Sequence, residues 1–371
     1  MADVPQTMPN GQPKPSEEQM KAAMDDMGHI GKALQAKPED PNATISIETV
    51  LLACATSPCM TRIIPNDVPS KIDELEEAMK AEKIDMEWVK ETSGQARRHA
   101  IALLWQLNRQ RASLKEKDAS LDGATAQHCS VAVQLATKLL VQSQMMFPQQ
   151  RWVEATLAVA RTSSLVANQL WSHTELEALV QMAVILKKEG LRRPKLRLEA
   201  VCEPKEVLPG AKVSVKVSPS CCRRPALARE ARLGSVGRSE SAAVLARPRP
   251  LPIHPPPPPP PQVMLLRHHA GFDGDEPPTP ANPSGMHEAY WLYVAGVKAD
   301  AAVAHSLLAA QPLAVRDLNE AAVEASIGFT APSDAGVYKL RVHVISTSVI
   351  GVDLDFTAEF EVAADDVPPL M

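Results

Sequence analysis

The chain has 371 residues, of which 45% are apolar, and a formal net charge of −5. This length predicts more than one domain, and the apolar fraction is sufficient for buried cores. The negative charge argues against broad binding to nucleic acid or to an anionic membrane, because both favour a basic surface.

The cysteines and the N-terminus together predict a cytosolic location. No Cys-x-x-Cys pair occurs, and a chain this long with so few cysteines is not a disulfide scaffold. We therefore expect reduced thiols and no metal at any of them. The N-terminal residues are polar, and no stretch has the ~18 apolar residues that a membrane span needs. We expect a soluble, cytosolic chain without a membrane span. The cysteines are Cys54, Cys59, Cys129, Cys202, Cys221 and Cys222.

The N-terminal half is predicted to be helical. Residues 1–43 are rich in Pro, Gly and Gln, so we expect mostly disorder there, with one short helix that begins at the capping box Ser16-Glu-Glu-Gln19. Residues 44–193 carry apolar side chains at helical spacing and predict a helical domain. Pro148 is expected to end one of its helices.

The spacing of apolar residues changes from the helical to the strand period at Pro194. Residues 194–362 contain short runs in which polar and apolar side chains alternate, separated by turn residues. Six or seven such runs favour an antiparallel β-sandwich of the immunoglobulin or fibronectin type III kind. The predicted fold class is therefore α+β, with an all-α domain followed by a sandwich and a tail at 363–371.

A segment without a folding period interrupts this sandwich at 218–285. It contains an Arg-rich and Ala-rich run and the proline tract Pro255–Pro261, which cannot enter a sheet. We interpret it as a disordered insertion. The tract could be a spacer or a polyproline II ligand for an SH3 or WW domain, and the whole segment could be an error of the gene model.

No motif in the sequence indicates catalysis. The nucleophile elbow, the phosphate-binding glycine loop and the zinc-protease helix motif are all missing. His268-His269 and the acidic residues at 273–276 lack the spacing of metal ligands. Asn42-Ala-Thr44 fits a glycosylation sequon, which matters only in a secretory lumen. We expect no enzyme activity, no cofactor and no metal.

Three positions have predicted structural roles in the sandwich. Tyr338 follows a turn and is expected to bond nearby backbone through its hydroxyl. Gly351 lies in a short turn and is expected to adopt a positive φ. Asp353 is expected to accept backbone N–H bonds across that turn.

Trp291 and Tyr293 are predicted to share one face of a strand. That face could belong to the sandwich core or to an interface.

Four segments, taken in order, resemble the Sec-sixty-three homology domain family. Tyr290-Trp-Leu-Tyr-Val-Ala295 is similar to the aromatic strand of that family, and Phe329–Tyr338 to its Ala-Pro then Gly-x-Tyr signature. Ser346–Asp353 resembles its Gly-x-Asp hairpin, and Trp152–Trp171 its paired tryptophan helix. The resemblance extends from about Thr44 to Val362. Its signature residues are Trp152, Trp171, Trp291, Pro332, Gly336, Tyr338, Gly351 and Asp353.

The resemblance implies a non-catalytic protein-interaction module. In the translocation members, the domain lies at the cytosolic face of the endoplasmic reticulum and contacts the protein-conducting channel and other translocon subunits. The J domain and membrane spans of those members are not found here, and their helix-hairpin-helix unit is lost or shortened. The alternative is a C-terminal regulatory module of a Ski-two-like RNA helicase. A free cytosolic adaptor acting through the proline tract is a third possibility. We expect no nucleic-acid partner.

Overall fold

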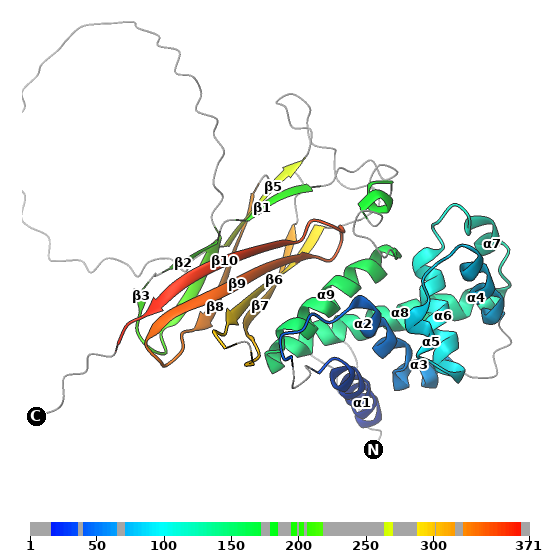
Figure 1. Ribbon diagram of the computed structural model, residues 1–371, viewed down its shortest axis with the longest axis horizontal. Helices are drawn as coiled ribbons and strands as arrows, with labels where there is room; N and C mark the ends of the chain where they lie inside the picture. The colour runs from blue at the N-terminus through cyan, green and yellow to red at the C-terminus, as the bar shows by residue number, and fades with distance from the viewer. Residues whose placement is uncertain are drawn as a thin grey trace, which may run out of the picture.

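The chain is described by a computed structural model, which combines helices in the N-terminal half with mostly antiparallel sheets in the C-terminal part (Figure 1). It is therefore an α+β protein, as predicted. The described residues are 16–35, 40–64, 71–171, 179–184, 194–198, 200–203, 206–217, 263–269, 288–300, 302–315 and 322–364.

The helices follow the predicted apolar spacing, and the first one begins at the predicted capping box. The Gln19 N–H donates to Ser16 Oγ at 3.2 Å, and the Ser16 N–H donates to Gln19 Oε1 at 2.9 Å. Pro148 lies in a 3₁₀ turn that ends the longest helix, as expected. The helical elements are α1 Glu17–Ala33, α2 Ile47–Ala55, α3 Pro58–Ile63, α4 Ile72–Ala81, α5 Glu87–Lys90, α6 Gly94–Asn108, α7 Lys115–Ala119, α8 Gly123–Met146, η1 Phe147–Gln150 and α9 Val153–Asn168.

Helix α9 is buried along most of its length because it packs against both halves of the molecule. Ala158 and Val159 belong to the core of the helical half. Val153 and Leu157 pack against the sheets instead. In Figure 1, α9 accordingly lies between the sheets and the other helices. Its apolar side chains therefore lie on more than one face, in contrast to a surface helix with a single apolar stripe.

The strands form two sheets that share one core. Val213 and Val215 of one sheet contribute to the same buried cluster as Leu340 and Val342 of the other. The first sheet has the order β1-β5-β8-β4-β2 and the second β3-β10-β9-β6-β7. The strands are β1 Pro194–Leu198, β2 Ala200–Glu203, β3 Glu206–Val207, β4 Lys212–Val217, β5 Val263–His269, β6 Glu288–Val297, β7 Ser306–Val315, β8 Ala322–Thr330, β9 Gly336–Ser346 and β10 Leu354–Val362.

Strand β5 corrects one of the predictions. It lies within 218–285, where the sequence indicated a disordered insertion, yet it pairs with both β1 and β8. Its Val-Met-Leu-Leu run has the apolar character of a strand, and the adjacent proline tract masked that signal. The other residues of the segment, including Pro255–Pro261, lie outside the described residues.

The register shows that β4 and β5 together occupy the place of a single strand. Along β8, Lys216 pairs with Ser326, Val263 with Ala325, and Met264 with Glu324. Val217 and Val263 are themselves partners, so the chain leaves β4 and returns in β5 at the same register position. The intervening residues are thus inserted at one point of a continuous strand line.

Among the residues that the structure describes, no helix combines the length and the apolar character that crossing a bilayer requires.

Candidate functional site: the junction of helices and sheets

The helical half is joined to the second sheet by backbone pairing just before α9. Trp152 forms an isolated antiparallel bridge with Ser306, and the Leu307 N–H donates to the Arg151 carbonyl at 3.1 Å. Arg151 has a φ of +60°, which is uncommon for a residue with a side chain. This left-handed residue turns the chain from η1 into α9 and brings Trp152 beside the first residues of β7.

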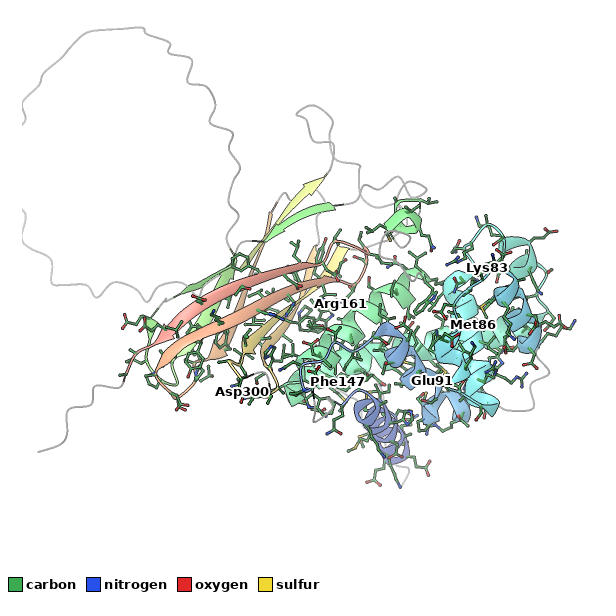
Figure 2. The ribbon with its side chains drawn as sticks, in the orientation of Figure 1. Lys83, Met86, Glu91, Phe147, Arg161 and Asp300 are labelled. Carbon is green, nitrogen blue, oxygen red and sulfur yellow. The ribbon has the colours of Figure 1, made fainter. Side chains whose placement is uncertain are left out.

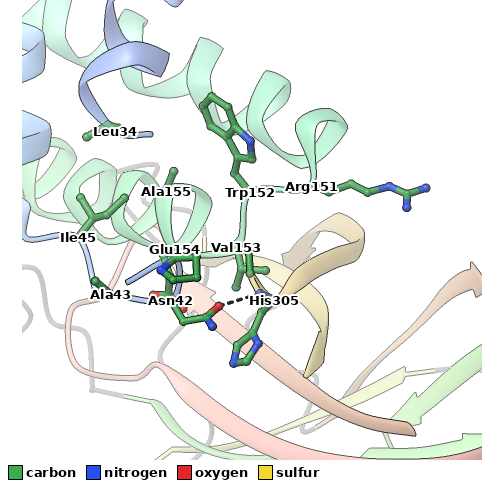
Figure 3. A pocket seen from close by; sticks show the side chains of 12 residues that line it. Leu34, Asn42, Ala43, Ile45, Arg151, Trp152, Val153, Glu154, Ala155 and His305 are labelled. Carbon is green, nitrogen blue, oxygen red and sulfur yellow. Dashed lines mark hydrogen bonds between the residues drawn. The ribbon is translucent and has the colours of Figure 1, made fainter. Parts of the chain in front are cut away.

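Asn42 ties a second point of the N-terminal half to the loop that precedes β7. Its Nδ2 donates to the Val303 carbonyl at 3.0 Å, and its Oδ1 accepts from the His305 N–H at 2.7 Å (Figure 3). The sequence suggested only a glycosylation sequon at this residue. Its amide instead substitutes for a short piece of strand pairing.

A small pocket lies beside Asn42, between the start of α9 and the loop before β7 (Figure 3). Its volume is about 60 Å³, which suits a few waters and not an organic substrate. Burial raises the pKa of the Glu154 carboxyl and lowers the pKa of His305. Both shifts reflect the loss of solvation at two ionisable groups where the helical half meets the sheet.

An apolar layer fills the junction between α9 and the outer face of the second sheet. Val153 and Leu157 of α9 pack there with Tyr293 and Ile345. Trp291 stacks on Tyr293 with ring centroids 5.8 Å apart and ring planes 6° apart. Tyr293 is fully buried, and burial raises the pKa of its hydroxyl. This face of β6 is therefore an interface with a helix of the same chain.

Charged groups border that apolar layer. Arg161 of α9 lies on the sheet side (Figure 2), with its Nε 3.8 Å from Asp353 Oδ2. Asp353 Oδ1 also accepts from the Ser346 N–H at 3.0 Å, which confirms the predicted role across the turn. His343 Nδ1 lies 2.6 Å from Asp355 Oδ1, and this hydrogen bond lowers the pKa of Asp355.

The structure separates the signature residues into three places. Trp152, Trp291 and Asp353 lie at the junction, and Gly351 precedes Asp353 in the same turn with a φ of +79°, positive as predicted. Trp171 packs against Trp88 in the helical half, with ring centroids 6.4 Å apart.

The other three signature residues lie on either side of the turn that leads into β9. Tyr338 there donates its hydroxyl to the Asp334 carbonyl at 2.8 Å, as predicted, and its ring lies 5.4 Å from that of Phe360. Pro332 precedes the turn, and Gly336 begins the strand.

The described part of the chain brings no three His, Cys, Asp or Glu side chains into a metal-binding group. Cys54, Cys59 and Cys129 are free and buried. Burial raises the pKa of Cys54 and of Cys129 to about 12, so neither thiol is a nucleophile at neutral pH.

Comparisons with known proteins add little to this description. No protein-family model matches the chain, and no curated protein matches it. One solved structure that aligns with it is a Pseudomonas fluorescens alkylpurine DNA glycosylase, AlkC, bound to DNA that contains an abasic site analog. The alignment covers 86% of this chain and 76% of that chain, at 11% identity and a TM-score of 0.21. A likeness at this level carries no inference about fold or function.

Proposed function

We propose that this chain is a non-catalytic protein-docking module. The observation that carries the proposal is the junction, which contains three signature residues at separate points. Trp152 bridges Ser306, Trp291 stacks on Tyr293, and Asp353 pairs with Arg161. Backbone pairing, the Asn42 amide, the apolar layer and the Arg161–Asp353 ion pair all fix the second sheet to the helical half. A module built in this way holds the outlying loops of the sheets at a set position relative to the helices, which a docking surface requires.

We further infer that the two sheets form an immunoglobulin or fibronectin type III-like sandwich. Two features support this inference: the core shared by the two sheets, and the Tyr338 hydroxyl bonded to backbone four residues upstream. The second feature has the geometry of a tyrosine corner.

The proposed partner is the protein-conducting channel of the endoplasmic reticulum, or another translocon subunit, at the cytosolic face of that membrane. The resemblance of the four segments to the Sec-sixty-three homology domain supports this choice. The net charge of −5 disfavours the alternative role as an RNA-helicase module. The adaptor role through Pro255–Pro261 rests on residues outside the described ones.

Binding of the purified chain to detergent-solubilised channel complex, measured by biolayer interferometry, tests the proposal. We expect binding that weakens in Asn42→Ala, because the junction loses the hydrogen bonds to Val303 and His305, and persists in Lys80→Ala. Lys80 is a suitable control because its ion pairs with Glu76 and Glu77 lie on α4. Filter binding with single-stranded RNA is the counter-test. Tight RNA binding with a steep salt dependence, together with no binding to the channel, would favour the helicase module instead.

A further inference from the structure

An open groove lies between α1 and the end of α8, apart from the signature residues of the sheets. Its volume is about 400 Å³, and Met24 and Met27 line it on α1, while Met146 and Phe147 line it on the other side. The Trp152 ring also contributes to the lining. Helix α1 precedes Thr44, where the family resemblance begins, so the resemblance does not account for this groove.

Methionines make the walls of this groove unusually apolar for a surface. Met24 is 72% exposed, Met146 is 36% exposed, and Met20, one turn before Met24, is 42% exposed. The buried side of α1 includes Met27 and Ile30, so Met27 forms the buried edge of the groove and Met24 its exposed edge. Methionine side chains are flexible and polarizable, and proteins use them where a surface must fit the side chains of a partner. We call this surface the methionine groove.

Two glycines form part of the α1 wall of the methionine groove. Gly28 and Gly31 lie inside α1, where glycine lowers helix stability relative to alanine. A Cβ at Gly31 would lie 3.6 Å from the Trp152 ring, so the α1 backbone lies directly against that ring. A Cβ at Gly28 would have no neighbour within 4 Å. The space beside Gly28 is therefore available to a side chain from elsewhere.

The charge around the groove indicates what kind of partner would fit. Of the described residues that line it, Lys32 supplies the charge, and Gln35 and Gln150 supply neutral amides. A partner with a carboxylate next to its apolar side chains would complement this arrangement, and a basic partner would be repelled. The concave shape suits an inserted helix face, whereas a lipid surface would favour a convex apolar patch.

We propose that the methionine groove binds an amphipathic helix of a partner protein. The helix inserts a large apolar side chain beside Gly28, against Met24 and Met146, and places an acidic side chain next to Lys32. This second surface shares Trp152 with the junction, but its tests use Gly28 and Lys32, which lie outside the junction, so either proposal can fail without the other.

NMR of the full chain with ¹³C-methyl methionine tests this proposal directly. The probe is a synthetic helical peptide with leucines along one face and a single glutamate beside them. Its twin carries lysine in place of glutamate. We expect the methyl signals of Met24 and Met146 to shift with the glutamate peptide. The signal of Met79, fully buried in α4, should not move.

Variants at two positions make the test specific. Gly28→Leu fills the groove and should weaken binding about tenfold or more, whereas Gly28→Ala, which also raises helix propensity, should leave it nearly unchanged. Lys32→Glu should reverse the preference between the two peptides. The dissociation constant of each peptide should change by about threefold. If Gly28→Leu lowers the thermal midpoint, its loss of binding could reflect unfolding. In that case the reversal in Lys32→Glu alone decides whether the proposal holds.

Four results would overturn the proposal. The first is an absence of shifts with either peptide, and the second is equal shifts with both. The third is shifts produced by phosphatidylcholine and phosphatidylserine vesicles but not by the peptides, which would make this a membrane contact. The fourth is shifts that appear when the chain alone is concentrated, which would make it a contact between two copies.

Discussion

Asp353 has partners in two different parts of the chain. One carboxylate oxygen accepts from the Ser346 N–H at 3.0 Å and so closes the turn between β9 and β10. The other lies 3.8 Å from Arg161 Nε on α9. Both side chains of this ion pair are about one-third exposed, so solvent screens it. The turn bond is therefore the larger contribution to stability.

Replacing Asp353 should separate these two contributions. We expect Asp353→Ala to lower the free energy of unfolding by about 1 kcal/mol, the typical net value of one hydrogen bond. Asp353→Asn keeps the acceptor and should cost less. Urea unfolding of the full chain measures both. Arg161→Ala is the control, and a loss in it as large as in Asp353→Ala would show that the ion pair dominates.

Gly351 is the position in the same turn where a side chain would strain the backbone. Its φ of +79° lies in the left-handed region that a β-branched residue adopts only with difficulty. Gly351→Val should cost on the order of 1–3 kcal/mol in urea unfolding, and Gly351→Asn markedly less. Should Gly351→Val keep full stability but lose channel binding, the turn would be a docking site and its structural assignment would be wrong.

At the scale of elements, α6 and α8 meet through a buried pair of histidines that the sequence did not single out. The rings of His99 and His128 are 5.7 Å apart in an edge-on arrangement. Burial lowers the pKa of His99, and burial together with the positive charge of His99 and Arg98 lowers the pKa of His128 to about 4. Both histidines are therefore neutral in the folded protein at pH 7.

This pair predicts a loss of stability in acid. The unfolded chain takes up protons on these histidines near their ordinary pKa of about 6.5, whereas folded His128 does so only near pH 4. The free energy of unfolding should therefore fall between about pH 6.5 and 4, by on the order of 1 kcal/mol per pH unit for His128. Urea midpoints at pH 7 and pH 5 measure this loss. His128→Phe should make it smaller, and an unchanged pH dependence in that variant would contradict the assignment.

The shared register of β4 and β5 predicts that the residues between them can be removed. Joining Val217 directly to Met264 keeps a valine opposite Ala325, and the flanking pairs to Ser326 and Glu324 stay in register. The thermal midpoint should stay the same or rise slightly, because closing a long loop costs entropy that grows slowly with its length.

Deleting 218–285 completely is the matched comparison, because it also removes β5 from its pairing with β1 and β8. We expect this larger deletion to lower the midpoint clearly. An equal midpoint for the two deletions would mean that β5 contributes nothing to the sheet. Sequencing of full-length transcripts would show whether the natural message contains the inserted residues.

On the scale of the whole molecule, contacts between residues far apart in sequence hold the two halves together. Asn42 contacts Val303 and His305 across 261 and 263 positions of the chain. The bridge between Trp152 and Ser306 spans 154 positions (306 − 152). We expect such contacts to form late in folding, because closing so long a loop costs entropy that only the completed contact surfaces offset.

Asn42→Ala should loosen this attachment without unfolding either half. We expect faster hydrogen exchange at the His305 amide, whose N–H loses its acceptor, and little change at amides within β9 and β10. Asn42→Asp is the informative control, since it keeps the acceptor for His305 and loses only the donor to Val303. Unchanged exchange at His305 in Asn42→Ala would place the attachment elsewhere in the junction.

Local roles were predictable where short-range geometry decides them. The capping box at Ser16, the hydroxyl bond of Tyr338, the positive φ of Gly351 and the acceptor role of Asp353 all appear as expected. Each depends on residues within about seven positions along the chain, so the sequence contains the full cause. Strand β5 was missed because its partners are remote and the neighbouring prolines dominate its local composition.

The sequence by itself determined the α+β class, the change from helices to strands near Pro194 and the local turns, because apolar spacing and turn chemistry are properties of adjacent residues. Only the tertiary structure decided that Trp291 and Tyr293 face α9, that β4 and β5 share one strand line, and that α1 and the end of α8 form the methionine groove. A side-chain period fixes which residues share a face, but not what covers that face. The covering element is chosen by long-range packing between surfaces that both exist only in the folded chain.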